Sequence, residues 1–195
     1  MALVHLDQRQ LHLKIVYYGP GFGGKTTNLM HLHNRIPPHL RGQWVALKSE
    51  EDRTLYFDFL PLNLGSGSGF QTRIHLYTVP GQVRFRRSRL VMLRDVDGII
   101  FVADSHPNRL HANEDSLKDL EMNLVELGLD LTKMPKVFQL NKRDLDPKTP
   151  EQVMRRSLGV GENPCFHAVA NQGRGVLETL KTMTKMVLRE LTPAP

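Results

Sequence analysis

Apolar and polar positions alternate along the chain with two different periods. Short apolar and β-branched runs predict strands, expected at residues 11–17, 54–60, 71–79, 98–103, 137–140 and 166–170. Apolar residues spaced three and four apart predict helices, expected at 25–35, after 82 to about 94, around 117–127, at 151–157 and at 176–191. This order predicts an α/β fold with a mostly parallel central sheet flanked by helices on both faces, in a single domain over residues 1–195.

Two stretches in the first half of the chain show neither period. Residues 39–53 are polar and are expected to be irregular. The run GSGSG at 65–69 is expected to form a flexible turn that joins the second and third predicted strands into a hairpin. By contrast, the run at 98–103 is continuously apolar, as in strands that a parallel sheet buries on both sides.

Composition fits a folded domain and leaves the ligand class open. Of the 195 residues, 40% are hydrophobic and 24% are charged, which excludes disorder as the default. The net charge of +6 suits an anionic ligand, nucleic acid, a membrane surface or an acidic partner, and selects none of them. Cys165 is the single cysteine, so we expect no internal disulfide and no zinc site. No apolar run approaches the roughly 20 residues of a membrane span, and neither end carries a signal peptide or lipidation motif. A cytoplasmic protein without a membrane anchor of its own is expected.

The segment GPGFGGKT at 19–26 fits the pattern G-x-x-x-x-G-K-[ST] between a predicted strand and a predicted helix. Glycines let backbone N–H groups surround phosphate oxygens, and the helix presents its positive end to them. Lys25 is expected to neutralise the β- and γ-phosphates, and the Thr26 hydroxyl to bind Mg²⁺. The expected nucleotide-binding residues here are Gly19, Gly21, Gly23, Gly24, Lys25, Thr26 and Thr27. A glycine turn with a chance Lys-Thr pair is the alternative, and the motif does not separate GTP from ATP.

The sequence NKRD at 141–144 follows a predicted strand and indicates guanine recognition. A carboxylate only accepts hydrogen bonds, so Asp144 can accept two from the ring N–H and the exocyclic amine of guanine. Adenine lacks that amine and should be rejected. Asn141 is expected to brace the loop and the base, and the stem of Lys142 to lie over the ring. A charged turn is the alternative, because N-K-x-D is short and frequent by chance.

Two further segments predict groups near a third phosphate. The backbone N–H of Gly81 can approach a γ-phosphate, and Gln82 can orient an attacking water. Upstream, Thr54 is a candidate Mg²⁺ ligand in a switch loop, and Arg53 is a candidate arginine finger in cis. The alternatives are a simple turn into a helix, which explains the glycine but not Gln82, and a solvated charge at Arg53.

The order of these motifs resembles that of the Ras-like small GTPases, and three runs are similar to the bacterial MglA family in particular. They are KIVYYGPG at 14–21, RTLYFDFLP at 53–61 and HLYTVPGQ at 75–82. The resemblance covers nearly the whole chain and implies a P-loop, Ras-like GTPase fold, GTP and GDP as ligands and Mg²⁺ as cofactor. It also implies a polarity switch of gliding or twitching bacteria, with a Roadblock-type activator similar to MglB and with polarity or motility effectors. Recruitment to cell poles or membrane would then depend on partners.

The resemblance implies roles for single residues as well. Gln82 matches the water-orienting glutamine, Arg53 the arginine finger of the family, and Thr54 the switch I threonine. Ala170 matches the position whose backbone N–H contacts the guanine oxygen. Thr78 stands where most Ras-like proteins have an Asp that holds Mg²⁺ through water. We therefore expect weaker Mg²⁺ binding and slow turnover without an activator.

One segment departs from the family pattern. After Gln82, MglA sequences usually show an aromatic pair and few charges, whereas this chain has VRFRRSR at 83–89, with four arginines in six residues. The candidate partner-binding residues are Arg84, Phe85, Arg86 and Arg87. They suggest an acidic partner and a divergent paralogue, whereas the alternative is a solvated basic face.

Together these features predict a GTP-binding and GTP-hydrolysing switch, monomeric on its own, in which Gln82, Arg53 and Lys25 carry the hydrolysis. The alternative is a nucleotide-binding docking module with little hydrolysis, whose basic segment holds an acidic partner. Nucleic-acid binding through the arginines is not expected, because no aromatic stacking platform or recognition helix accompanies them.

Overall fold

The computed structural model describes residues 3–5, 9–47, 57–67, 70–81 and 85–191. The strands in this part of the chain are β1 (Leu3–His5), β2 (Gln10–Tyr18), β3 (Val45–Leu47), β4 (Phe57–Gly67), β5 (Phe70–Thr78), β6 (Gly98–Asp104), β7 (Lys136–Asn141) and β8 (Cys165–His167). The α-helices are α1 (Lys25–Arg35), α2 (Arg86–Leu93), α3 (Leu110–Glu126), α4 (Glu151–Ser157) and α5 (Val176–Leu191). Short 3₁₀ helices lie at η1 (Pro38–Leu40), η3 (Pro107–Arg109), η4 (Leu131–Lys133) and η5 (Ala170–Gln172).

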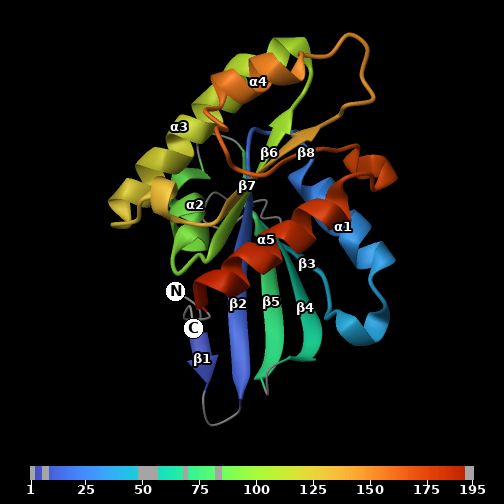
Figure 1. Ribbon diagram of the computed structural model, residues 1–195, viewed down its shortest axis with the longest axis vertical. Helices are drawn as coiled ribbons and strands as arrows, with labels where there is room; N and C mark the ends of the chain where they lie inside the picture. The colour runs from blue at the N-terminus through green and yellow to red at the C-terminus, as the bar shows by residue number, and fades with distance from the viewer. Residues whose placement is uncertain (1–2, 6–8, 48–56, 68–69, 82–84, 192–195) are drawn as a thin grey trace.

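The strands form one mixed sheet, which runs vertically in Figure 1. Their order is β3-β4-β5-β2-β6-β7-β8, and β1 pairs with β2 outside this path. Within that order, β5, β2, β6, β7 and β8 run parallel to one another. β4 runs antiparallel to β5, and β3 runs antiparallel to β4. The mostly parallel α/β sheet expected from the sequence is therefore confirmed, and the carboxyl ends of its parallel strands share one edge.

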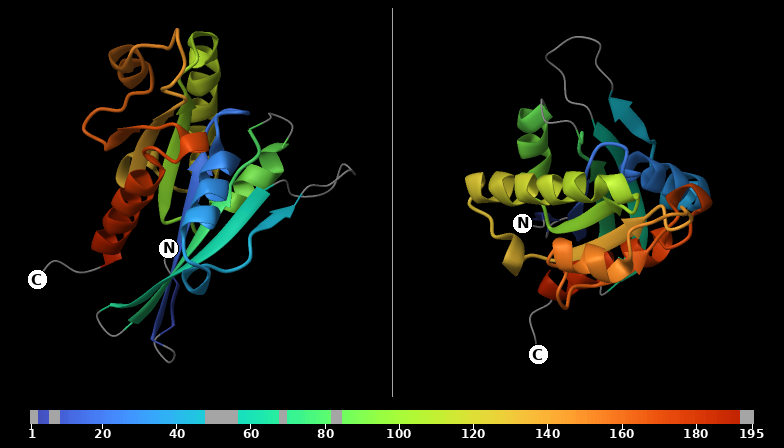
Figure 2. Two further views of the ribbon diagram at one scale, coloured as in Figure 1. Left: turned by 90° about the vertical axis from the view of Figure 1, so that its right-hand side faces the viewer. Right: turned by 90° about the horizontal axis from the view of Figure 1, so that it is seen from above.

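Helices cover both faces of the sheet, as the two views of Figure 2 show. On one face, α1 and α5 pack on the strands through the buried side chains Leu29, Leu32, Val176, Leu180, Met183 and Val187. On the other face, α2, α3 and α4 contribute the buried side chains Met92, Leu93, Leu120, Leu124 and Met154. Each helix buries one apolar stripe, which explains the three- and four-residue spacing in the sequence.

Close packing on the first face depends on a glycine at the start of β6. A Cβ atom at Gly98 would lie 2.4 Å from the Met183 sulfur and 2.8 Å from a methyl carbon of Val187. Real Cβ atoms do not approach other atoms this closely, so only glycine lets α5 lie this near to β6.

Within the described ranges, no helix has the length and apolar character needed to cross a membrane.

Several predicted elements are confirmed, and others have different bounds. Helices α1 and α4 begin and end where the sequence predicts. The expected turn at 65–69 is wrong in its first half, because β4 continues to Gly67 through its pairing with β5. The stretch 39–53, expected to be irregular, contains β3, which pairs with β4. The last strand ends at His167 rather than at residue 170, because Ala170 begins a 3₁₀ helix. In each case cross-strand pairing or turn geometry overrides local composition.

Candidate functional site

The loops that carry the predicted motifs meet at the carboxyl edge of the sheet. The glycine-rich loop follows β2, the Pro80-Gly81 turn follows β5, the NKRD loop follows β7, and Ala170 follows β8. In open α/β sheets this edge is the usual place for a ligand, since loops from neighbouring strands converge there. The fold thus brings together segments that lie as far as 150 residues apart, as the bounds of β2 and η5 show.

Two glycines of the loop at 19–26 have a steric reason to be glycine. Gly19 has a φ of 137°, and a Cβ atom there would lie 2.2 Å from the Val102 carbonyl oxygen. Gly24 has a φ of 102°, and a Cβ atom there would lie 2.1 Å from the side-chain nitrogen of Asn141. Both positive φ values are ones that side chains disfavour. The loop is therefore packed tightly against β6 and β7 and leads directly into α1 at Lys25.

Lys25 lies inside this loop and is only 6% exposed. Its Nζ atom donates hydrogen bonds to the carbonyl oxygens of Gly19 and Pro20, each at 2.7 Å. Burial lowers the pKa of the Lys25 ammonium to about 7, and the nearby Asp58 carboxylate opposes that shift. The loop thus encloses a cation whose charge is costly until an anion joins it. Thr27 lies half-buried in the same first turn of α1.

Asn141 connects three loops of the site. Its Nδ2 atom donates to the Gly23 carbonyl oxygen at 2.8 Å, which joins the loop after β7 to the glycine-rich loop. Its Oδ1 atom accepts the Ala170 backbone N–H at 2.9 Å. The Ala170 N–H, for which the resemblance implies a guanine contact, therefore has a partner within the protein in this structure. Asn141 itself is buried, as a residue that braces loops should be.

The remaining residues of the NKRD loop face outward to different degrees. Lys142 has a φ of 62°, and its Nζ atom donates to the Asp104 Oδ2 atom at 2.6 Å. The backbone N–H of Arg143 donates to the Ala168 oxygen at 3.1 Å, which fixes the loop against the segment after β8. Asp144 is exposed. Its carboxylate is therefore accessible to hydrogen-bond donors of a base.

The structure identifies a carboxylate that sequence reasoning missed. Asp58 of β4 accepts hydrogen bonds from the hydroxyl groups of Thr26 at 2.6 Å and Thr78 at 2.8 Å. Its own backbone N–H donates to the Thr78 hydroxyl at 2.9 Å. A buried Asp in the strand FDFLPL was the available signal, because such a residue needs polar partners. A carboxylate and two hydroxyls are oxygen donors of the kind that Mg²⁺ prefers, so this set fits the metal.

The turn after β5 lies directly against the glycine-rich loop. A Cβ atom at Gly81 would lie 2.3 Å from the Gly21 nitrogen, so glycine is required for this approach. Gly81 thus lies beside Gly21, whereas Asn141 contacts the same loop at Gly23 and Gly24. The predicted residues Arg53, Thr54, Gln82 and Arg84 lie outside the described residues.

The described arginines of the segment 83–89 do not all share one solvated face, so that alternative does not hold for Arg89. Arg89 is only 3% exposed, and its guanidinium group bonds both carboxylate oxygens of Asp119, at 2.8 and 3.1 Å. Arg86 pairs with Glu126 of α3, whereas Arg87 is exposed. Phe85 precedes α2 and is half-buried. The exposed basic surface of the described segment is therefore narrower than expected, because α3 supplies acidic partners.

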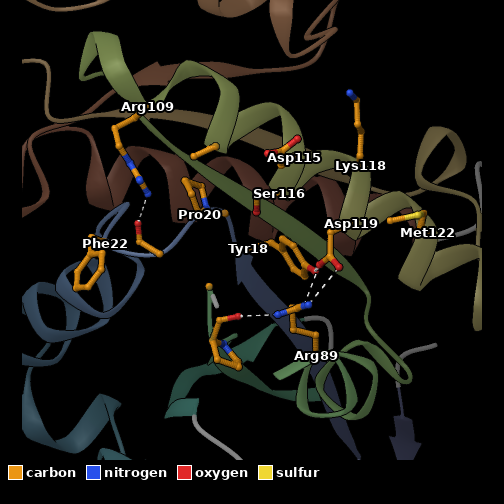
Figure 3. A pocket seen from close by; sticks show the side chains of 15 residues that line it. Tyr18, Pro20, Phe22, Arg89, Arg109, Asp115, Ser116, Lys118, Asp119 and Met122 are labelled. Atoms are coloured by element: carbon orange, nitrogen blue, oxygen red, sulfur yellow. Dashed lines mark hydrogen bonds and ion pairs between the residues drawn. The ribbon is translucent and has the colours of Figure 1, made fainter. Parts of the chain in front are cut away.

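A cavity of about 590 Å³ lies between the glycine-rich loop, α2 and α3. Figure 3 shows four of its lining residues, with Tyr18 and Asp119 close to Arg89 and with Phe22 on the side of the glycine-rich loop. The Tyr18 hydroxyl donates to Asp119, and burial raises the pKa of Tyr18, so this donor stays protonated. The cavity adjoins the Gly21–Gly81 contact and thus the interior of the site.

The mostly parallel sheet, the glycine-rich loop between β2 and α1 and the NKRD loop that Asn141 joins to it define a P-loop protein of the Ras-like small GTPase class. No protein-family model matches the chain. The chain is, however, 50% identical over 191 residues to the mutual gliding-motility protein MglA of Myxococcus xanthus (strain DK1622), with 98% of each chain covered. At this identity and coverage, the chain belongs to the MglA family of Ras-like GTPases.

Proposed function

We propose that the chain is a single-domain switch that binds GTP and GDP and hydrolyses GTP. Gly19, Gly21, Gly23, Gly24, Lys25, Thr26, Thr27, Gly81, Asn141, Lys142, Asp144 and Ala170 are the described residues that we assign to the nucleotide, and Thr54 joins them. The observation that carries the proposal is the bridge from Asn141 to both the Gly23 carbonyl and the Ala170 N–H. This bridge ties the loop for phosphate to the loops for the base, so that one ligand can span both.

Base selection follows from the exposed Asp144. A carboxylate that only accepts hydrogen bonds pairs with the two neighbouring donors of guanine and finds an acceptor on adenine. When the Ala170 N–H donates to the guanine oxygen, it continues to donate to the Asn141 Oδ1 atom as well. Lys142, held by Asp104 at 2.6 Å, extends its stem beside the position of the base.

The residues that would hold Mg²⁺ are Thr26 and Asp58, with Thr54 joining in the GTP state. Thr26 donates to Asp58 at 2.6 Å in the present arrangement, so the two oxygens already lie together. When bound, Mg²⁺ neutralises the negative charge that develops on the phosphates. Thr78 hydrogen-bonds Asp58 and thereby holds this carboxylate in place. Asp58 thus compensates in part for the neutral Thr78 of β5.

We assign hydrolysis to three side chains. Gln82 orients the attacking water in line with the departing GDP, and Arg53 stabilises the charge on the transferred phosphoryl group. Lys25 holds the β- and γ-phosphates and offsets their charge. Hydrolysis is slow until an activator brings Gln82 and Arg53 into place, because neither belongs to the rigid glycine-rich loop.

The proposed biological role rests on the similarity to the Myxococcus protein. The Myxococcus protein is named for gliding motility, and we propose that this chain controls polarity or motility in the same way. A Roadblock-type activator similar to MglB and motility effectors are the partners that we assign to the segment Arg84, Phe85, Arg86 and Arg87. We further propose that the chain alone is monomeric, does not bind nucleic acid, and acts in the cytoplasm, from which partners recruit it to the poles.

The competing function is a docking module that holds nucleotide without hydrolysing it. Its support was the neutral Thr78 together with a basic surface at 83–89. Asp58 provides a carboxylate beside Thr78, and Asp119 pairs with Arg89, so both supports are weaker than the sequence suggested. We therefore favour the hydrolysing switch.

The test is single-turnover GTP decay, with and without a Roadblock activator, in Arg53→Ala and Gln82→Leu. We expect stimulated hydrolysis to fall by about 10³-fold or more in the arginine variant, the usual contribution of an arginine finger. The affinity for GDP should change little, since we assign both side chains to the attacking water and the transferred phosphoryl group, which GDP lacks. Arg156→Ala, an exposed arginine on α4 to which no role is assigned, is the matched control for the loss of charge. Stimulated turnover that stays at the wild-type rate in both variants would contradict the mechanism.

A further inference from the structure

Arg109 links the end of η3 to the glycine-rich loop, although no sequence motif includes it. Its Nη2 atom donates a hydrogen bond to the Gly21 carbonyl oxygen at 2.7 Å, the contact marked beside Phe22 in Figure 3. Its Nε atom lies 3.8 Å from the Oδ2 atom of Asp104, which is buried at the end of β6. The guanidinium group thus lies between the Asp104 carboxylate and the glycine-rich loop, and it contacts both.

The peptide that Arg109 contacts has an unusual conformation. Phe22 follows Gly21 with a φ of 63°, in the left-handed region that bulky residues disfavour. The Phe22 side chain is 87% exposed, so it gains little packing in return for this conformation. The hydrogen bond from Arg109 to the preceding carbonyl is the contact that fixes the same peptide unit.

The direction of this peptide determines what its N–H can bind. In a trans peptide the C=O and N–H bonds point in opposite directions, so the Phe22 N–H points away from Arg109. The Gly21–Phe22 unit lies at the end of the loop next to Gly81, since a Cβ atom at Gly81 would be 2.3 Å from the Gly21 nitrogen. The opposite end of the loop, at Gly23 and Gly24, lies against Asn141 and the base-recognition loop. The peptide is therefore at the terminal-phosphate end of the loop.

We propose that Arg109, anchored by Asp104, is a positioning residue that turns the Gly21–Phe22 peptide so that its N–H is presented to the β-phosphate of a guanine nucleotide. This inference rests on the proposed nucleotide-binding function. Asp104 serves the other end of the ligand as well, because its Oδ2 atom also accepts from Lys142 at 2.6 Å. The buried Asp104 carboxylate thus fixes the positions of both Arg109, at the phosphate end of the site, and Lys142, at the base end.

The position of Asp104 is itself fixed by the fold. Its backbone N–H donates to Asn113 of α3 at 2.8 Å, and its carbonyl oxygen accepts from the same amide at 2.9 Å. The Asp104 Oδ1 atom accepts the His106 backbone N–H at 3.0 Å. The anchor therefore belongs to the rigid junction of β6 and α3, and Arg109 transmits that rigidity to the loop.

Arg155 on α4 offers a matched control outside the loops of the site. It donates to the Gly161 carbonyl oxygen at 3.0 Å and lies 3.8 Å from Glu151. Its side chain is 36% exposed, against 35% for Arg109. The two arginines therefore make the same kinds of contact with the same exposure, and only Arg109 touches the glycine-rich loop.

The experiment measures the dissociation rate of a fluorescent GDP analogue and the affinities for GDP and GMP in Arg109→Met, Arg109→Lys and Arg155→Met. We expect Arg109→Met to speed GDP dissociation about tenfold, the loss of one hydrogen bond to a charged group. Affinity for GMP should change less than about twofold, because GMP has no β-phosphate for the Phe22 N–H to contact. A general disturbance of the fold would instead weaken the binding of GDP and GMP alike. Arg109→Lys keeps one donor and should restore most of the wild-type rate, and Arg155→Met should match wild type.

The inference is overturned if Arg109→Met leaves GDP dissociation unchanged, or if it weakens GMP as much as GDP. Should the methionine variant not fold, Arg109→Gln gives the same readout, because its amide is too short to reach the Gly21 oxygen. A wild-type protein that binds no guanine nucleotide would instead remove the proposed function, and the inference with it.

Discussion

Lys25 shows how a single buried charge prepares the site for an anion. Its Nζ atom is satisfied by the carbonyl oxygens of Gly19 and Pro20, yet burial lowers its pKa to about 7. In the unfolded chain a lysine titrates near 10.4. Between these values the unfolded state binds more protons, so the stability of the nucleotide-free protein rises with pH across this window. Below pH 7 the charged ammonium is present in both states, and its desolvation cost is complete.

This shift predicts proton uptake when nucleotide binds. Phosphate oxygens beside Lys25 favour the ammonium form, so binding at pH 8 should transfer close to one proton from the buffer to the site. The nucleotide's own phosphates are fully ionised at that pH and contribute little. The measurement is calorimetric titration with GDP in two buffers of different ionisation enthalpy.

Lys25→Arg is the control for this prediction, because a guanidinium group stays charged at pH 8 and cannot take up a proton. It should bind with no buffer dependence. A wild-type binding enthalpy that is the same in both buffers would show that Lys25 is already charged in the free protein.

At the residue scale, the sequence predicts only those site residues that belong to a local motif. Gly24 and Lys25 lie in one contiguous loop, and the loop's backbone geometry dictates its glycines. Asp58 and Arg109 belong to no such pattern, because their partners Thr78 and Gly21 lie 20 and 88 residues away. Contacts of this kind depend on which strands become neighbours, and that is decided by the tertiary fold.

At the scale of elements, the pair Arg89–Asp119 joins α2 to α3. Arg89 is almost fully buried. Its Nη1 atom also donates to the Pro80 carbonyl oxygen at 3.4 Å, which links α2 to the turn beside Gly81. Asn123 donates to the Asp119 carboxylate and to the Tyr18 hydroxyl, each at 3.0 Å. α2 is therefore attached to β2 and α3 through the shared carboxylate of Asp119.

We predict that Arg89→Met destabilises the protein by about 2–3 kcal/mol, the lower side of the cost of breaking a buried ion pair, since Asp119 retains some exposure. Arg87→Met, on the same helix but exposed, should stay within about 0.5 kcal/mol of wild type. The double variant Arg89→Met with Asp119→Asn should recover part of the loss, because no charge is left unpaired and the amide oxygen can still accept from Tyr18 and Asn123. Urea unfolding followed by circular dichroism measures all three. Equal midpoints for the Arg89 and Arg87 variants would show that the pair contributes nothing.

Elements with strong periodicity are predictable from the sequence, and short elements are not. The stripe at Val176, Leu180, Met183 and Val187 predicts α5, and those side chains are buried in the structure. β1 and β3 have three residues each and pair at the margins of the sheet, so they carry no measurable alternation. Their existence follows from the hydrogen-bonding edges that β2 and β4 offer.

At the scale of the whole molecule, the fold separates support from recognition. Both apolar cores lie between the sheet and its helices, and the motif-bearing loops lie together at the carboxyl edge. The Gly21–Gly81 approach brings the turn after β5 into contact with the phosphate end of this edge. We infer that a ligand with one phosphate more or less acts on this turn, which is what a nucleotide switch requires.

The most direct test of that account is the binding of fluorescent analogues of GDP and of xanthosine diphosphate in Mg²⁺, each competed by GTP, GDP, ATP and xanthosine diphosphate, with wild type, Asp144→Asn and Asp146→Asn. Asp146 is an exposed aspartate two residues further along the same loop and controls for lost charge. We predict that wild type and Asp146→Asn respond to guanine nucleotides alone. Asp144→Asn should lose guanine and accept xanthine, because the amide can donate to the carbonyl that replaces the exocyclic amine. Displacement by ATP as effective as by GTP, or guanine binding that survives in Asp144→Asn, would contradict the account.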